Sequence, residues 1–90
     1  MESQAMRVDG NALAGTLGEI FVPEMTTARV ACGGCGKTEP IGAEYAYMRA
    51  PGFVLRCCHC EEVLFVLAQT GSRHVLGIGR ARSLEVSESP

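Results

Sequence analysis

The chain has 90 residues, a formal net charge of −2 and a hydrophobic fraction of 47%. This length fits one small domain, and the composition is too apolar for a disordered chain. Eight basic side chains against ten acidic ones give no electrostatic reason to expect nucleic-acid binding, which usually needs a clustered basic surface. No run approaches the ~18 apolar residues of a membrane-spanning helix, and the first residues lack a signal-peptide pattern, so we expect a cytoplasmic protein.

A short helix is predicted near the start of the chain. Residues 1–7 read as a flexible tail, after which the oxygens of Asp9 and Asn11 can accept the free amides of a first helical turn. Apolar side chains at helical spacing then predict a helix over residues 11–20, which Pro23 ends. The residues on its apolar face are Leu13, Leu17, Ile20 and Phe21. We expect this face to be part of the core.

From Thr26 onward the sequence is typical of β-structure. Strands are predicted over residues 28–32, 44–48, 53–57 and 63–67, with a tight turn at 50–52. The continuous apolar run at 63–67 predicts burial on both faces. After a turn at 69–72, one alternation phase predicts a last strand that contains His74, Leu76, Ile78, Leu84 and Val86. Gly77 and Gly79 indicate a bulge or a close backbone approach in that strand.

Four of the five cysteines form two Cys-x-x-Cys turns. Cys32-Gly33-Gly34-Cys35 is the first turn and Cys57-Cys58-His59-Cys60 is the second, with 21 residues between Cys35 and Cys57. Two such pairs separated by roughly 15–20 residues are the pattern of a zinc site. Because tetrahedral Zn²⁺ takes four ligands, each turn supplies half of the shell. The spacing therefore predicts a structural Zn²⁺ held by Cys32, Cys35, Cys57 and Cys60.

The second turn is less regular than the first. Cys58 or His59 is a chemically reasonable alternative ligand, because zinc accepts thiolate and imidazole. Cys57 and Cys60 alone repeat the geometry of the first turn, so Cys58 is expected not to be a ligand. Glu61 stands where the first turn has Gly36, which indicates a different backbone or greater strain in the second turn.

Other candidate residues are weaker. Lys37 is expected to offset the charge of the zinc–thiolate centre, and His59 to hydrogen-bond near it. Arg73, Arg80 and Arg82 can form a basic strip for nucleic acid, although a solvated sheet face is the favoured interpretation. His74 is expected to be a partly buried strand residue rather than a catalyst. Asp9 and Asn11 can bind a ligand or cap the helix, and we favour capping.

The segment Val8-Asp9-Gly10-Asn11-Ala12-Leu13-Ala14-Gly15, followed by Leu17, Glu19, Phe21 and the two cysteine turns, resembles a family of small actinobacterial proteins of unknown function. The similarity runs from about Val8 to Val86. The resemblance implies a zinc-ribbon-like protein with the same four cysteines as ligands. It implies no activity, because none is known for the family.

Together these features predict a single α+β domain over residues 8–86: a small zinc-ribbon-type antiparallel β domain with an N-terminal helix, followed by a tail at 87–90. We expect no enzymatic activity, because four cysteines close the coordination shell that a catalytic zinc keeps open. The expected function is a protein-interaction module that binds an unknown partner or itself. A nucleic-acid-binding zinc ribbon is the alternative, and a thiol-redox protein ranks third.

Overall fold

The computed structural model describes residues 7–49 and 52–87 of the chain. The larger of its two antiparallel sheets has five strands in the order β1-β4-β5-β6-β7. These strands are β1 (Arg7–Asp9), β4 (Tyr45–Arg49), β5 (Gly52–Arg56), β6 (Val63–Thr70) and β7 (Arg73–Ile78). From β4 to β7 each strand pairs with the next one along the chain, so tight local turns build most of the sheet. The predicted turn at 50–52 and the predicted tails at 1–7 and 87–90 lie largely outside the described residues. Arg7, expected in the first tail, is instead the first residue of β1 and pairs with Tyr47.

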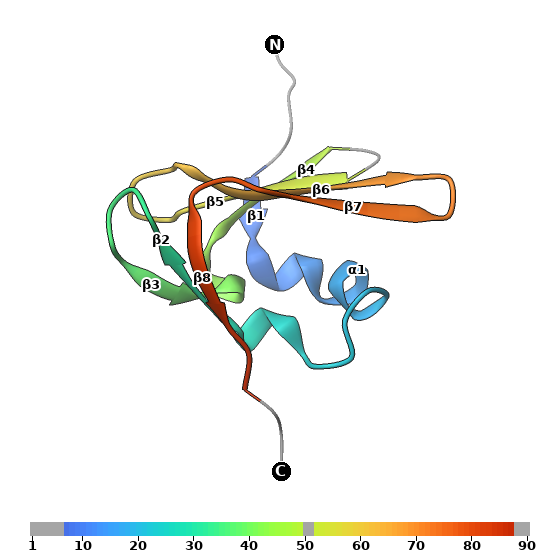
Figure 1. Ribbon diagram of the computed structural model, residues 1–90, viewed down its shortest axis with the longest axis horizontal. Coiled ribbons are helices and arrows are strands. Elements are labelled where there is room, and N and C mark those ends of the chain that lie inside the picture. Colours follow the sequence, from blue (N-terminus) through green and yellow to red (C-terminus); the bar gives the residue numbers. More distant parts are fainter. Residues whose placement is uncertain (1–6, 50–51, 88–90) are drawn as a thin grey trace.

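The smaller sheet contains three strands in the order β3-β2-β8. They are β2 (Arg29–Cys32), β3 (Thr38–Pro40) and β8 (Ala81–Glu85). Figure 1 shows this sheet and the helical segments on the same side of the larger sheet. The predicted α+β class is therefore confirmed at the level of two antiparallel sheets with one short helix.

The N-terminal helix is shorter than predicted. A 3₁₀ turn, η1 (Gly10–Leu13), precedes the α-helix α1 (Ala14–Gly18), and two further 3₁₀ turns are η2 (Met25–Thr27) and η3 (Ile41–Ala43). Asp9 accepts a hydrogen bond from the amide of Asn11 at 3.1 Å and so caps η1. This contact supports the capping interpretation of the Asp9–Asn11 segment. The two glycines of α1, Gly15 and Gly18, have a low helix propensity and are consistent with its single turn and a half.

The core lies between the larger sheet and the helical segments. Leu13 and Leu17 are 0% and 2% exposed, and Ile20 and Phe21 pack against the core as partly buried residues. The expected burial of the helix face is therefore confirmed. The other buried hydrophobic residues are Met25, Ala28, Val30, Cys32, Ile41, Ala46, Phe53, Leu55, Cys57, Leu64, Phe65 and Leu67.

The prediction of one continuous last strand was wrong. The segment divides into β7 in the larger sheet and β8 in the smaller one, and the chain bends between Ile78 and Ala81. The Gly79 amide donates to the Leu64 carbonyl at 2.9 Å, and a Cβ on Gly79 would lie 2.6 Å from the Val63 carbonyl oxygen. This is the close backbone approach that the glycine indicated. The bend links the two sheets beside the cysteine turns.

Burial along β6 also differs from the prediction. Leu64, Phe65 and Leu67 are buried, whereas Val66 is 38% exposed. The outer face of the larger sheet is therefore partly open at this strand. Among the described residues, no helix is both long enough and apolar enough to cross a membrane.

Candidate metal centre

The first cysteine turn joins β2 to β3 and is closed by backbone hydrogen bonds. The Gly36 amide donates to the Cys32 carbonyl at 2.8 Å, and the Cys32 amide donates to the Lys37 carbonyl at 2.8 Å. The Gly34 amide points at the Cys32 sulfur, with an N–Sγ distance of 3.3 Å. Such N–H bonds to sulfur stabilise a thiolate and fix its direction. Cys35 completes the turn on its exposed side.

The second cysteine turn joins β5 to β6 and repeats the same bonds at matching positions. The Glu61 amide donates to the Cys57 carbonyl, and the Cys57 amide donates to the Glu62 carbonyl, both at 2.9 Å. The His59 amide lies 3.4 Å from the Cys57 sulfur. The two turns are therefore copies of one backbone design, each with a buried first cysteine and an exposed second one.

Of the two alternatives expected for the second turn, a different backbone or greater strain, the structure shows the second. Gly36 has φ = 81° and Glu61, at the equivalent position, has φ = 66°. Glycine adopts this left-handed conformation without steric cost, whereas an L-residue with a Cβ is strained there. The second turn accordingly has the strain that the sequence indicated, in an unchanged backbone.

Replacing Glu61 with glycine should stabilise the metal-loaded domain by about 1 kcal/mol, because the left-handed strain is removed. The Glu61 backbone carbonyl accepts a hydrogen bond from the Arg56 guanidinium at 2.9 Å, and this contact is kept in the variant. The measurement is the free energy of unfolding by chemical denaturation. Gly36→Ala is the matched control and should destabilise, since a Cβ there meets no atom within 4 Å and only the φ cost remains. If Glu61→Gly and the parent have the same free energy of unfolding, the proposed strain at Glu61 is contradicted.

The two turns bring four sulfurs together, and we call Cys32, Cys35, Cys57 and Cys60 the Cys₄ cluster. Their Sγ atoms all lie within 4.8 Å of one another, with Cys32–Cys60 and Cys35–Cys57 each at 3.6 Å. A tetrahedron with zinc–sulfur bonds of about 2.3 Å has sulfur–sulfur edges of about 3.8 Å. All five cysteines lie in the described ranges, and none forms a disulfide. The cluster thus has the donor type and spacing that a thiolate-binding metal ion requires.

The thiols of the Cys₄ cluster do not titrate alike. Burial raises the pKa of Cys32, but hydrogen bonds from the amides of Cys35 and Gly34 outweigh it and lower this pKa to about 7. The Glu62 amide lowers the pKa of Cys60, but loss of solvent and the neighbouring thiols raise it to about 12. The pKa of Cys57 is raised, mainly by burial. Four thiolates so close together need a cation, so metal binding releases protons and weakens as the pH falls.

The remaining residues of the second turn lie outside the Cys₄ cluster. The Cys58 amide donates to the Glu44 carboxylate at 2.9 Å, and burial together with Glu44 raises the pKa of the Cys58 thiol to about 11. His59 points to Glu39, with Nε2 and Oε2 2.7 Å apart. Lys37 is exposed, and its carbonyl closes the first turn. The side chains of Cys58 and His59 are therefore not members of the Cys₄ cluster, although both residues are next to it in the chain.

Sequence reasoning missed Glu39 and Glu44. Glu44 is 1% exposed, and burial raises the pKa of its carboxyl. A glutamate beside a strand normally indicates a solvated position. Burial of Glu44 follows from the fold, because its carbonyl accepts from Gly10 at 2.9 Å and its side chain holds Cys58. No local pattern carries this information.

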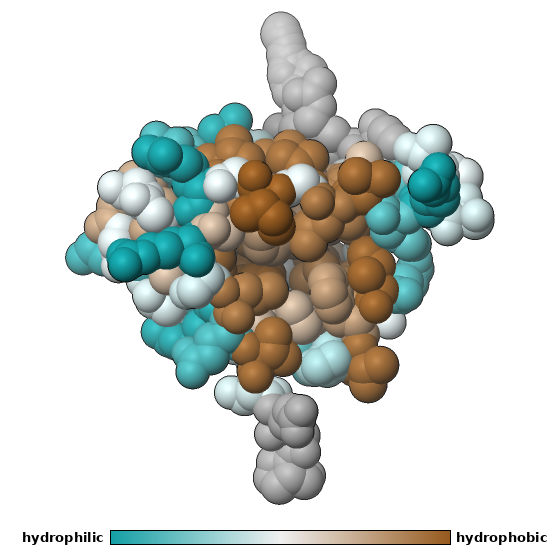
Figure 2. Space-filling model, in the orientation of Figure 1, coloured by the Kyte–Doolittle hydropathy of each residue, from teal (hydrophilic) through white to brown (hydrophobic). Residues whose placement is uncertain are grey.

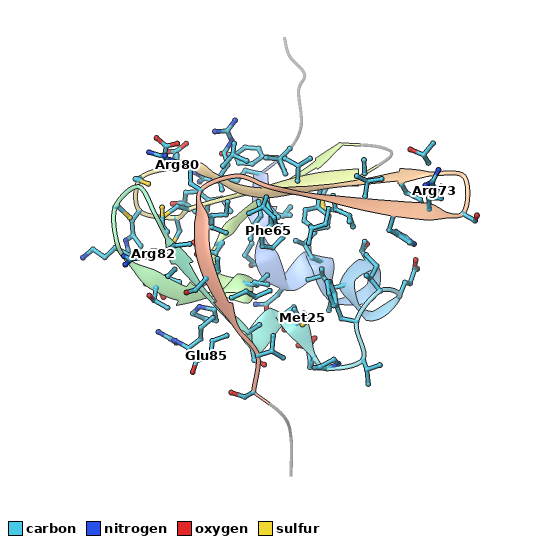
Figure 3. All side chains as sticks on the ribbon, in the orientation of Figure 1. Met25, Phe65, Arg73, Arg80, Arg82 and Glu85 are labelled. Atoms are coloured by element: carbon cyan, nitrogen blue, oxygen red, sulfur yellow. The ribbon has the colours of Figure 1, made fainter. Side chains whose placement is uncertain are left out.

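The three arginines considered for nucleic-acid binding are not gathered at one place. Figure 3 shows Arg73 at the far end of the β6–β7 hairpin, with Arg80 and Arg82 at the end that holds the cysteine turns. Arg80 lies 3.7 Å from the Glu62 carboxylate, a long pairing between exposed groups. His74 is partly buried in β7, as expected, and its Nδ1 has no hydrogen-bond partner within the described structure.

Comparison with known proteins identifies a family for the chain, and the description of that family gives no function. A model described as a family of unknown function, DUF6510, matches residues 2–89. No curated protein and no solved structure matches the chain. The match spans both cysteine turns and every strand described above. The chain therefore belongs to the DUF6510 family.

Proposed function

We propose that this protein is a non-enzymatic domain in which zinc in the Cys₄ cluster holds the fold, while strand β7 binds a second copy of the chain. The closed shell of four thiolates leaves zinc no open position for a substrate, which supports a structural role for the metal. The observation that carries the binding function is the open edge of β7 beside an apolar groove.

The first part of that observation is the unpaired edge of β7. This strand ends the five-stranded sheet, and within the described residues it pairs with β6 alone. Thr70 and Arg73 flank the two-residue turn and are opposite each other, and the Gly79 amide bonds to Leu64 in the same register. Because bonded pairs alternate along an antiparallel ladder, the odd-numbered residues of β7 bond to β6. The backbone groups of His74, Leu76 and Ile78 therefore face outward.

The second part is an apolar groove next to this edge, which we call the β7 groove. It has a volume of about 220 Å³, and its lining includes Leu17, Phe21, Phe65, Leu76, Ile78 and Leu84. Figure 2 shows the hydrophobic side chains gathered in the middle of this face. Ile78 is 66% exposed and Leu76 is 38% exposed. Contiguous apolar surface of this kind marks interaction sites in soluble proteins.

The strand also lacks the usual protection of a sheet edge. Proteins discourage edge pairing with lysine, proline or inward-pointing charges. The sequence of β7, Arg-His-Val-Leu-Gly-Ile, has one charged residue, at its first position. An incoming strand would gain hydrogen bonds to His74, Leu76 and Ile78 and would place its own side chains over the β7 groove. This is recognition by β-strand addition.

A second copy of the chain fits this edge, because the β7 strand of that copy carries the free backbone groups and the apolar side chains that complement it. Antiparallel pairing about a twofold axis would set Leu76 opposite its own counterpart and would join the two β7 grooves, as in other isologous interfaces. A six-residue edge with one groove is small against the ~800 Å² per partner of a standard interface. We therefore expect a reversible dimer rather than an obligate one.

The test is sedimentation of the zinc-loaded protein over a range of concentrations. The parent should dimerise reversibly, and Ile78→Lys should weaken the dimer at least tenfold, because the lysine would bring a charge into the joined grooves. Val66→Lys is the control, since Val66 is an exposed valine of the same sheet, 38% exposed, that does not line the groove. A monomeric parent at all concentrations, or equal effects of the two lysines, would contradict the second copy as occupant.

The nucleic-acid alternative has its own measurement. Titration with DNA and with RNA at two salt concentrations would support it if binding weakens steeply with salt and falls in the alanine variants of Arg73, Arg80 and Arg82. The separation of Arg73 from the other two arginines favours the protein-binding proposal. A dithiol that cycles in protein free of zinc would favour the redox function instead.

A further inference from the structure

Three side chains beside the Cys₄ cluster form a second group of metal-ligand type. Glu39 belongs to β3, and Cys58 and His59 are the two inner residues of the second cysteine turn. One oxygen, one sulfur and one ring nitrogen from these residues all lie within 4.8 Å of one another. The His59 Nε2 and a Glu39 carboxylate oxygen are 2.7 Å apart. We call Glu39, Cys58 and His59 the second cluster.

The donor set matches a particular class of cation. Carboxylate, thiolate and imidazole are the three side-chain ligands that Zn²⁺ takes in proteins, with bonds of about 2.0–2.3 Å. Ligand atoms around such an ion are therefore about 3.3–3.8 Å apart. Glu39 and His59 are 33% and 38% exposed, so both side chains can move the short distance required. A thiolate and an imidazole disfavour Mg²⁺ and Ca²⁺, which prefer oxygen ligands.

Buried charge behind the second cluster favours a cation in the same place. Glu44 is 1% exposed, and its carboxylate accepts the Cys58 amide at 2.9 Å. The carboxylate thus fixes the backbone of the turn and lies next to Cys58, one member of the second cluster. No arginine or lysine is paired with Glu39 or Glu44 in the described residues. A buried acid without a cationic partner is costly, and a divalent cation nearby would offset that cost.

From this juxtaposition we infer that Glu39, Cys58 and His59 form a second, exchangeable site for a borderline-soft divalent cation such as Zn²⁺. Three protein ligands leave one coordination position to water, whereas the Cys₄ cluster supplies all four. The second cation should therefore bind more weakly and exchange faster than the first. This site does not depend on self-association at β7, and it gives the fifth cysteine of the chain a role.

The experiment uses protein that holds one equivalent of Zn²⁺ and titrates it with Co²⁺, whose thiolate charge-transfer absorption reports a cobalt–sulfur bond. The parent should bind one Co²⁺ without releasing its zinc. Cys58→Ser should abolish the charge-transfer band, and Glu39→Gln or His59→Gln should weaken Co²⁺ binding at least tenfold. Glu62→Gln is the matched control, because Glu62 is an exposed acid of the same turn that lies outside the second cluster.

Two results would overturn this second site. One is the absence of Co²⁺ uptake by the zinc-loaded parent at millimolar Co²⁺. The other is uptake that releases an equal amount of zinc, because Co²⁺ would then be replacing the ion of the Cys₄ cluster. Circular dichroism of each variant shows whether it is folded, so loss of the site is not confused with loss of the fold. If Glu62→Gln lowers affinity as much as Glu39→Gln, the effect is general surface charge and the inference fails.

Discussion

Replacing Cys32 or Cys60 with serine should unfold the domain at neutral pH. A structural zinc contributes on the order of 10 kcal/mol to folding, and small domains have total stabilities of about 5–15 kcal/mol. The four sulfurs join β2 and β3 to β5 and β6, segments from both sheets. Loss of one thiolate would leave three ligands, a weaker metal site, and a domain without its main cross-link. Far-UV circular dichroism and metal content of the purified variants are the measurements.

Cys58→Ser is the matched control for these substitutions. Cys58 lies in the same turn, but its sulfur is not part of the Cys₄ cluster. Its amide contact with Glu44 comes from the backbone and would remain in the variant. We therefore expect Cys58→Ser to fold and to retain the tightly bound zinc. Equal damage from Cys58→Ser and Cys60→Ser would show that the ligand set is different.

Removal of the metal from the parent protein tests the same link without a substitution. A strong chelator should remove zinc and native structure together, and added Zn²⁺ should restore both. Recovery of zinc-free protein with an unchanged circular dichroism spectrum would mean that the apolar core alone maintains the fold. The protein should also be purified under conditions that do not strip bound metal. If it then contains no zinc, the Cys₄ cluster binds another metal or none.

The Cys₄ cluster could be predicted because the information that specifies it is local. Each turn places two cysteines at a fixed spacing, and the fold then needs only to bring the turns together. The strands at 29–32, 45–49 and 52–56 were found within one residue for the same reason, since alternation and turn residues are short-range signals. The left-handed conformation of Glu61 was also indicated by the sequence, because the equivalent position of the first turn is a glycine, Gly36.

What could not be predicted depends on contacts between distant segments. β1 and β3 have three residues each, too few for a periodic pattern. Apolar residues stand at even-numbered positions both before and after the break between β7 and β8, as in Leu76, Ile78 and Leu84. The sequence pattern therefore does not reveal that the chain changes sheet. Burial of Glu44 and the approach of Glu39 to His59 arise when β3 meets the second turn. The apolar periodicity at 11–20 correctly predicted a buried face, but the α-helix runs only from Ala14 to Gly18, in keeping with the low helix propensity of its two glycines.

Leu13→Ala should destabilise the domain by about 2–5 kcal/mol, the usual cost of truncating a fully buried leucine. Leu13 is 0% exposed at the end of η1, and it belongs to the same core as residues of both sheets. For a domain of this size, each kcal/mol lowers Tm by about 4–8 °C. Thermal unfolding followed by circular dichroism, with zinc kept in excess, is the measurement.

The control for this substitution is Val22→Ala, which also shortens an apolar side chain in the N-terminal region. Val22 is fully exposed, so its truncation should change stability by no more than about 0.5 kcal/mol. Point substitution is a cleaner test than deletion of residues 1–22, because deletion would also remove β1 and expose the edge of β4. If Leu13→Ala melts at the parent temperature, the N-terminal segment does not contribute to the core. The segment that carries Leu17 and Phe21 would then not form a fixed wall of the β7 groove. In that case only the edge of β7 would remain as the surface for self-pairing.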